Sequence, residues 1–408
     1  MRLLSVAVMA ALLPAVPLQQ RAGTTYYVDS RAGDDGAAGT SATAPWKTLD
    51  KVNAADLKPG DAISFKRGSS WDGQLKLSAK GTASRPIVAQ AYGNGSLAKI
   101  TGECVLVDGS HWRVSGLRAT GCRWAGFEVA GDGNVLSGVQ ADKNVAGVWV
   151  TPTGRRNTIR DSRLTGNNKM SVNDDTPDND SGAFGVLLNG DDNVVIGNTI
   201  TGSYAASHDY VTDGAAVEVY NGDRNLVLRN VARNNETFTE LGAQKGRTAT
   251  GNVFAFNVVT STRKRGSFLV TRGPGHIVGP VKGTVAVQNS VYLPARDTIG
   301  WSCGDGCSPS ILKLRNNVIA VGGQAGYEDG TGADEAGSVY QARSFKFKLG
   351  PKSVKADPRF VSTSDLHLRP GSPAIGRGVS LSPESYGGAK ASLAKPLPSA
   401  PDAGAYQH

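Results

Sequence analysis

The sequence predicts an all-β solenoid, in which short parallel strands stack as successive coils along one axis. An asparagine recurs in the frame apolar-x-apolar-x-Asn-x-apolar, at Asn198, Asn230, Asn257, Asn289 and Asn316. By subtraction the spacings are 32, 27, 32 and 27 residues, and self-similarity at a period of about 20–50 residues is typical of solenoids. The repeated segments are short, β-branched and alternating, which indicates strands rather than helix pairs. Gly or Asn also interrupts almost every window of ten residues, which argues against long helices.

The five asparagines are expected to lie one above another in successive coils, with each amide bonded to the next. Such a ladder satisfies buried polar groups and fixes the register between coils. Asparagine also marks turns, but five repeats in one frame favour the ladder.

The N-terminus has the pattern of a secretory signal. Arg2 precedes an apolar run from Leu3 to about Val16, followed by small and polar residues. This run is shorter than the roughly 20 residues of a transmembrane helix. We therefore assign residues 1–23 to a signal peptide and expect a secreted, extracellular protein; a buried N-terminal strand is the alternative.

The mature chain, residues 24–408, is expected to form a single domain. Regular coils are predicted from about residue 81 to residue 361, with residues 24–67 as an N-terminal cap and residues 371–408 as a tail packed on the coils. A stack of parallel coils needs such cover because its end strands would otherwise expose unpaired edges.

Four cysteines are predicted to form two local disulfides. Cys104 and Cys122 are 18 residues apart, close to one short coil, and Cys303 and Cys307 flank a Gly-containing loop. Local pairing is the natural choice in an oxidising compartment. A zinc site is the alternative, but only His111 lies between the first two cysteines and no histidine lies near the second pair.

Two coils carry insertions at the same place. Segments with a common pattern begin at Asn134, Asn157, Asn193, Asn225 and Asn252, so their separations are 23, 36, 32 and 27 residues. The second and third separations exceed the first by 13 and 9 residues, and both excesses follow the Asn strand, at 168–182 and 204–214. Insertions at equivalent positions emerge on one side of a solenoid, which is often its binding face. We expect these two loops to form a wall of a cleft.

The cleft is predicted to contain paired carboxylates. An ungapped alignment of GAFGVLLNGDDN with GAAVEVYNGDRN places Glu218 opposite Val186, and Glu240 follows Glu218 by 22 residues, about one coil. Residues one coil apart stack with backbones about 4.8 Å apart. Glu218, Glu240 and Asp213 are therefore the candidate catalytic residues, although a one-residue bulge would decide whether Glu218 faces the core or the cleft.

Several segments resemble a known group of proteins. They are TTYYVDSRAGDD, LKPGDAISFKRGSSW and GTASRPIVAQAYGNG near the start, and ADPRFVSTSDLHLRPGSPAIGRG and PDAGAYQH at the end. Together they resemble the secreted, carbohydrate-active right-handed parallel β-helix proteins of the pectate-lyase-like superfold. The resemblance implies a single-stranded right-handed parallel β-helix. It does not select a reaction, because the superfold includes lyases, hydrolases and non-catalytic surface proteins.

Three functions follow from these observations. The first is a glycoside hydrolase, because glycosidic cleavage uses two carboxyl groups; no cofactor is then expected. The second is a polysaccharide lyase acting on a uronate polymer, in which Asp175, Asp178 and Asp180 would bind Ca²⁺. The third is a non-catalytic glycan-binding surface protein.

Six further side chains near the predicted cleft are candidate substrate contacts: His208, Asp209, Tyr220, Lys169, Lys245 and Arg272.

Charge points to the class of partner. The formal net charge is +9, which favours an acidic polysaccharide or another anionic surface. The basic residues lack aromatic interleaving and a recognisable nucleic-acid-binding fold, so nucleic acid is not expected as a partner. A monomer that does not insert into membranes is expected.

Overall fold

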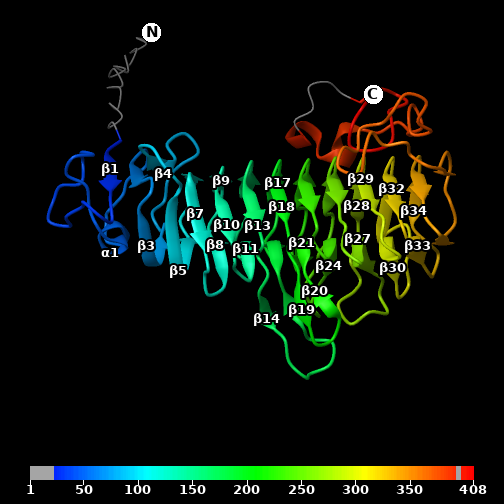
Figure 1. Cartoon of the computed structure of the whole chain (residues 1–408), viewed down its shortest axis with the longest axis horizontal. Coiled ribbons are helices and arrows are strands. Elements are labelled where there is room, and N and C mark those ends of the chain that lie inside the picture. The colour runs from blue at the N-terminus through cyan, green and yellow to red at the C-terminus, as the bar shows by residue number, and fades with distance from the viewer. Residues whose placement is uncertain (1–22, 392–396) are drawn as a thin grey trace, which may run out of the picture.

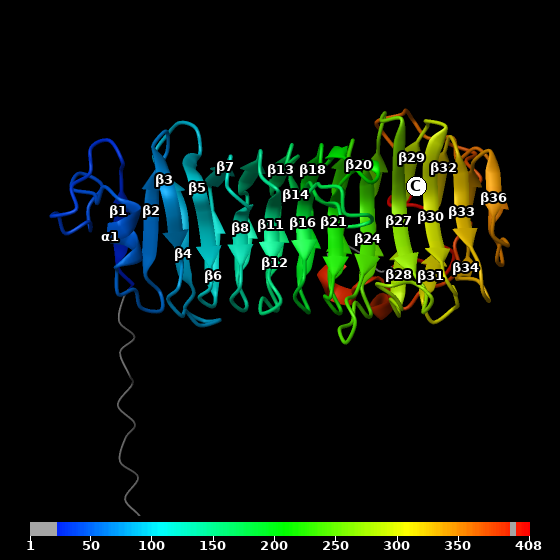
Figure 2. The same ribbon diagram turned by 90° about the horizontal axis from the view of Figure 1, so that it is seen from below.

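The computed structural model describes residues 23–391 and 397–408, which form an elongated stack of parallel strands (Figures 1 and 2). Residues 1–22 of the predicted signal peptide lie outside the described residues. Each coil contributes strands to three sheets, and hydrogen bonds run from coil to coil along the axis. The chain is therefore a parallel β-helix, as predicted. Among the described residues, no helix is both long and apolar enough to cross a membrane.

The first sheet contains twelve strands. In order they are β1 (Thr25–Val28), β2 (Ala62–Lys66), β4 (Ile87–Tyr92), β6 (Trp112–Ser115), β9 (Val135–Ser137), β12 (Thr158–Arg160), β17 (Val194–Ile196), β22 (Leu226–Leu228), β25 (Val253–Ala255), β28 (Thr284–Val287), β31 (Leu312–Arg315) and β34 (Asp334–Ala336).

The second sheet runs beside it. Its strands are β7 (Leu117–Thr120), β10 (Gln140–Asp142), β13 (Arg163–Thr165), β18 (Thr199–Thr201), β23 (Val231–Arg233), β26 (Val258–Thr260), β29 (Ser290–Leu293), β32 (Val318–Val321), β35 (Val339–Gln341) and β37 (Val354–Lys355).

The third sheet carries the candidate site. Its strands are β3 (Ser70–Lys76), β5 (Ala98–Val107), β8 (Ala125–Val129), β11 (Ala146–Val150), β16 (Phe184–Leu188), β21 (Ala215–Tyr220), β24 (Thr237–Gly242), β27 (Arg265–Arg272), β30 (Asp297–Gly304), β33 (Gln324–Glu328) and β36 (Ser344–Lys346). The long strand β5 pairs with both β7 and β8, and so joins the second and third sheets.

The interior is a continuous apolar stack along the axis. Val, Ile, Leu and Phe side chains from all three sheets belong to one buried cluster, because strands of parallel sheets bury their apolar side chains against each other. Phe238 and Phe268 on neighbouring coils stack at 5.5 Å between ring centroids. The rigid stack fixes the positions of the outward-facing side chains.

Two asparagine ladders run along the described part of the stack, from coil to coil. One links Asn134, Asn157, Asn193, Asn225 and Asn252, with each backbone N–H donating to the side-chain oxygen of the next at 2.9 Å. The other links Asn198, Asn230, Asn257 and Asn289 in the same way at 3.0 Å, as predicted.

The fifth predicted ladder position is wrong by one residue. Asn289 donates to Asn317 at 3.0 Å, because Thr284 rather than Val285 pairs with Leu312. Asn316 instead has a left-handed φ of 55° and binds the C-terminal tail, where its side chain exchanges hydrogen bonds with Val379.

The coils begin earlier than predicted. Strands β1, β2 and β3 fall within or just after the segment expected to be a cap, and β1 already pairs in parallel with β2. The long connection from residue 29 to residue 61 hides this first strand from a search for repeats. It contains α1 (Leu49–Asn53), whose Leu49 and Val52 join the interior cluster.

The C-terminal tail lies on the outside of the coils (Figure 1). It contains two short 3-10 helices, Pro383–Tyr386 and Gly388–Ala391. Tyr386 packs edge-on against Phe256 at 5.6 Å, on the outer side of the first sheet.

Both predicted disulfides are present. Cys104 is bonded to Cys122, and Cys303 is bonded to Cys307. The Cys104–Cys122 bridge closes an 18-residue separation, for which the chain-entropy model gives about 3 kcal/mol of stabilisation.

Candidate active site

The two insertions form adjacent hairpins on one side of the molecule, below the stack in Figure 1. They are β14 (Met170–Val172) with β15 (Ser181–Gly182), and β19 (Ala205–Ser207) with β20 (Val211–Asp213). Carboxylates of the two hairpins connect one hairpin to the other. The N–H of Asn179 donates to Asp209 at 3.0 Å, and the N–H of Asp209 donates to Asp180 at 2.9 Å. The acidic residues therefore order the loops and make them one wall.

Glu218 and Glu240 are direct neighbours on the outer face of the third sheet, on β21 and β24. On its other side, in the preceding coil, Glu218 pairs with Leu187 on β16. The alignment with Val186 is therefore wrong by one residue, because Val186 pairs with Val217 in the interior. Ala183 accounts for the shift: it lies between β15 and β16 with a left-handed φ of 58°, so the paired strand begins at Phe184.

The two glutamates line a cavity of about 320 Å³ between the sheet and the first insertion hairpin, β14–β15. Apolar and aromatic side chains form one part of its lining, and the remainder is polar. The lining residues are Trp124, Asp178, Asn179, Asp180, Ser181, Phe184, Leu187, Asn189, Glu218, Tyr220, Glu240, Gly242, Arg272 and Val278.

Arg272 is the cation of the cavity. Its guanidinium donates to Glu240 through Nη2 and to the carbonyl of Leu241 through Nη1 at 2.9 Å. Nε of Arg272 lies 3.3 Å from Nε2 of His276. Burial and the Arg272 charge lower the pKa of His276, which favours the neutral imidazole. Glu240 is therefore a carboxylate with a fixed counter-charge.

Glu218 and Asp213 are carboxyl groups with raised pKa values. Burial is the largest cause for each, and the charge of Glu240 adds to it. The pKa of Asp213 rises to about 7, against a hydrogen bond from the Gly214 N–H that lowers it. The pKa of Glu218 lies well above its usual value. The site therefore combines carboxyl groups whose raised pKa values favour the protonated form with an ion-paired glutamate, Glu240.

The other predicted contacts fall into three groups. Tyr220 and Arg272 line the cavity with the glutamates, and Asp209 holds the wall. His208 lies 3.3 Å from Asp175 on the exposed side of the hairpins and does not line the cavity. Neither do the two lysines: Lys169 donates to the Cys122 carbonyl at 3.3 Å, and Lys245 is exposed.

The three aspartates predicted as calcium ligands have different surroundings. Asp175 is exposed and faces His208, Asp178 lines the cavity, and Asp180 is buried and accepts from Ser207 at 2.7 Å. Across the part of the chain that the structure describes, no group of three or more His, Cys, Asp or Glu side chains is arranged to hold a metal ion.

Sequence reasoning missed the aromatic side of the site. Trp149 lies on the outer row next to Leu187, packs edge-on against Trp124 at 5.7 Å and donates to Asn189 at 2.5 Å. Asn189 in turn donates to the carbonyl of Tyr220 at 2.7 Å. The spacing of the coils could have predicted this position, because Trp149 and Glu218 occupy the same outward row, two coils apart.

Comparison with known proteins agrees with this architecture. Residues 103–279 match the family model described as a right handed beta helix region. A stretch of 95 residues is 47% identical to lacto-N-biosidase of Bifidobacterium longum subsp. longum, over 22% of this chain and 6% of that protein. The chain thus spans a small part of that relative's length.

Three solved structures share the fold. Pectate lyase Pel9A has a TM-score of 0.58 at 17% identity, covering 96% of this chain and 98% of its own. The GH136 lacto-N-biosidase from Eubacterium ramulus has a TM-score of 0.53 at 16% identity, covering 82% and 67%. XylC in complex with xylose has a TM-score of 0.53 at 9% identity, covering 83% and 87%. This chain is a right-handed parallel β-helix.

Proposed function

We propose that this protein is a glycoside hydrolase that cleaves a glycan in the cavity between the third sheet and the first insertion hairpin. The observation that carries the proposal is the pairing of Glu218 and Glu240 on neighbouring coils, both lining one cavity. The two are different chemically, since one has a raised pKa and the other has a guanidinium partner. Similarity to a lacto-N-biosidase over 95 residues supports the reaction class.

In this mechanism Glu218 is the general acid. Burial and the nearby carboxylates raise the pKa of Glu218 well above its usual value, which favours the protonated form that can donate to the glycosidic oxygen as the bond to the anomeric carbon breaks. The charge that develops on the sugar ring is positive, and Glu240 supplies the opposing negative charge. Arg272 keeps Glu240 in place through its ion pair.

Adjacent coils favour retention of stereochemistry. Neighbouring parallel strands are about 4.8 Å apart, which matches the separation of about 5–5.5 Å between the two carboxyl groups of retaining glycosidases. Glu240 would then attack the anomeric carbon and form a covalent glycosyl intermediate. Glu218, now deprotonated, would take a proton from the water that hydrolyses this intermediate, which restores both groups.

The aromatic side of the cavity provides the sugar-binding surface. Tyr220 and Trp124 line it together with Leu187, and Trp149 supports Trp124. Aromatic rings offer a rigid apolar face with a polar edge, which suits the mixed surface of a sugar ring. We propose that the sugar next to the cleaved bond packs here.

Product analysis tests the proposal. The purified protein is incubated with neutral and acidic polysaccharides and with oligosaccharides that end in lacto-N-biose. Saturated reducing ends, formed equally in the presence of a chelator, are the expected result. Unsaturated uronates that absorb in the near ultraviolet would identify a lyase instead, and no cleavage of any glycan would favour a binding protein.

Replacing Asp213 by Asn is expected to move the alkaline limb of the kcat/KM profile to lower pH. Asp213 is ionised above its pKa of about 7, and its charge raises the pKa of Glu218. Without that charge Glu218 loses its proton at lower pH, so the acid form disappears earlier. The pH profile of kcat/KM measures the shift. Asp297→Asn, which removes an exposed charge from β30, is the control, and an unchanged profile for Asp213→Asn would contradict the assignment.

A further inference from the structure

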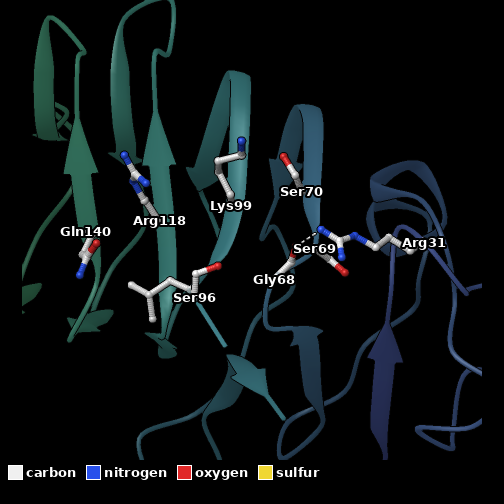
Figure 3. A pocket seen from close by; sticks show the side chains of 9 residues that line it. Arg31, Gly68, Ser69, Ser70, Ser96, Lys99, Arg118 and Gln140 are labelled. Carbon is white, nitrogen blue, oxygen red and sulfur yellow. Dashed lines mark hydrogen bonds between the residues drawn. The ribbon is translucent and has the colours of Figure 1, made fainter. Parts of the chain in front are cut away.

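A second cavity lies far along the chain from the glutamates, near the N-terminal end of the stack (Figure 3). Its volume is about 280 Å³, close to the lower end of the roughly 300–1,000 Å³ range of small-ligand sites. The lining combines three cations, three serines and no carboxylate. The residues are Arg31, Gly68, Ser69, Ser70, Ser96, Leu97, Lys99, Arg118 and Gln140.

The coil register aligns the cations in one outward row. Lys99 on β5 pairs with Arg118 on β7, and Gln140 on β10 pairs with Arg118 on one side and with Arg163 on the other. Neighbouring positions in this row are about 4.8 Å apart. Lys99 and Arg118 are thus adjacent, as Figure 3 shows. Arg163 continues the row two coils beyond Arg118.

Few of these charges are compensated. Arg118 is held by Asp142 in a two-point ion pair, with contacts of 2.7 and 3.0 Å. In the described part of the chain, Arg31, Lys99 and Arg163 take part in no ion pair. Arg31 instead donates to the Gly68 carbonyl at 2.7 Å, which brings its guanidinium to the edge of the cavity (Figure 3).

The nearby carboxylates are already bound. Asp29 accepts from Ser69 at 2.9 Å and from the backbone N–H of Arg31. Asp72, two residues beyond Ser70 on β3, accepts from Thr101 at 2.7 Å. Asp142 already offsets the charge of Arg118, so the charge that a ligand anion would compensate here is that of Lys99.

We propose that this cavity binds a carboxylate-bearing sugar of an acidic glycan and serves as a substrate-anchoring site separate from the cleft. Lys99 and Arg118 would bind the carboxylate by charge-assisted hydrogen bonds, Ser70 would contact ring hydroxyls, and Leu97 would contact the apolar edge of the ring. Arg163 would meet the next acidic sugar of a chain that runs along the axis. The inference does not depend on the reaction in the cleft, because it concerns binding alone.

Binding of a defined galacturonate oligomer to the full chain, measured by titration calorimetry, tests the proposal. Lys99→Gln and Arg118→Gln are each expected to weaken binding about tenfold, the typical effect of losing one charged hydrogen bond. Lys99→Arg keeps the charge and should bind like the wild type. Lys80→Gln removes an exposed lysine outside the cavity and is the matched control. Wild-type affinity should fall as salt is raised.

The cleft variant Glu240→Gln separates the two sites. If the galacturonate oligomer binds here, Glu240→Gln retains its affinity whether or not the protein proves to be a hydrolase. Thermal unfolding of each variant verifies that the fold is intact. Wild-type affinity in both Lys99→Gln and Arg118→Gln would overturn the proposal, as would equal binding of a neutral oligomer or binding of inorganic sulfate and heparin without the galacturonate.

Discussion

Glu218→Gln and Glu240→Gln are each expected to lower kcat at least about 100-fold, as loss of a general acid or of its partner carboxylate does. The amide preserves the shape of each side chain but has no proton to donate at Glu218 and no negative charge at Glu240. Steady-state kinetics on the substrate found by product analysis measures the effect. The loss should appear in kcat more than in KM, because both groups act mainly on the transition state.

Glu128→Gln is the matched control for the two glutamates. Glu128 lies in the same outward row, where it pairs with Trp149, which pairs with Leu187, which pairs with Glu218. Its pKa is also raised, by burial and by Asp108, so it shares the local environment without lining the cavity. Its substitution should leave kcat within about twofold of the wild type. Full activity in both cleft variants, or an equal loss in Glu128→Gln, would place the chemistry elsewhere.

The glutamine variants also separate the two roles. Glu240→Gln removes a negative charge that raises the pKa of both Glu218 and Asp213. The remaining acid should therefore ionise at lower pH, and any residual activity should have an alkaline limb shifted in that direction. Glu218→Gln has lost the acid itself, so its residual activity should lack that limb.

The repeating part of the molecule could be predicted because its physics repeats. Each coil has to bury one apolar stripe and satisfy one row of backbone turns, so the same residue types recur at coil spacing. The ladder at Asn198, Asn230, Asn257 and Asn289 is the direct result. The side on which the two insertions emerge followed from the same regularity.

The predicted register between coils was wrong in two places, each time by one residue. Ala183 displaces the strand that pairs with Glu218, and a one-residue shift of β31 moves the ladder from Asn316 to Asn317. A single residue in a left-handed turn changes the pairing of everything after it, yet Ala183 carries no sequence signal for that conformation, which is uncommon outside Gly, Asn and Asp. Registers of this kind depend on packing between coils.

The contacts made by non-repeating loops could not be predicted from the sequence for a different reason. Trp124 and His276 join the site from turns and loops of other coils, and their positions depend on how those loops fold over the sheet. Lys169 and Lys245 were proposed because they are near the cleft in sequence, but proximity along a loop does not determine where a long side chain lies. The row containing Trp149 could have been found from the coil spacing alone.

Asn230→Leu is expected to destabilise the protein by about 3 kcal/mol or more, since each buried polar group left unpaired costs about 1–3 kcal/mol. The side-chain oxygen of Asn230 accepts from the backbone and the amide of Asn198, both at 3.0 Å. Its amide donates to the Val195 carbonyl at 2.9 Å and to Asn257 at 3.1 Å. Leucine has a similar size but replaces none of these bonds, so the backbone N–H of Asn198 and the Val195 carbonyl lose their partners inside a dry core.

The same substitution at an exposed asparagine gives the reference. Asn168 is exposed at the start of the first insertion, and Asn168→Leu should change stability by no more than about 0.5 kcal/mol. Chemical denaturation followed by circular dichroism measures both variants, and the slope with denaturant shows whether the stack still unfolds as one unit. Because each coil contacts only its neighbours, a broken rung at Asn230 interrupts the stack in its middle, next to the strands that carry Glu218 and Glu240. Asn230→Leu should therefore reduce activity at temperatures where Asn168→Leu retains it, and equal stability of the two variants would show that the ladder does not hold the coils together.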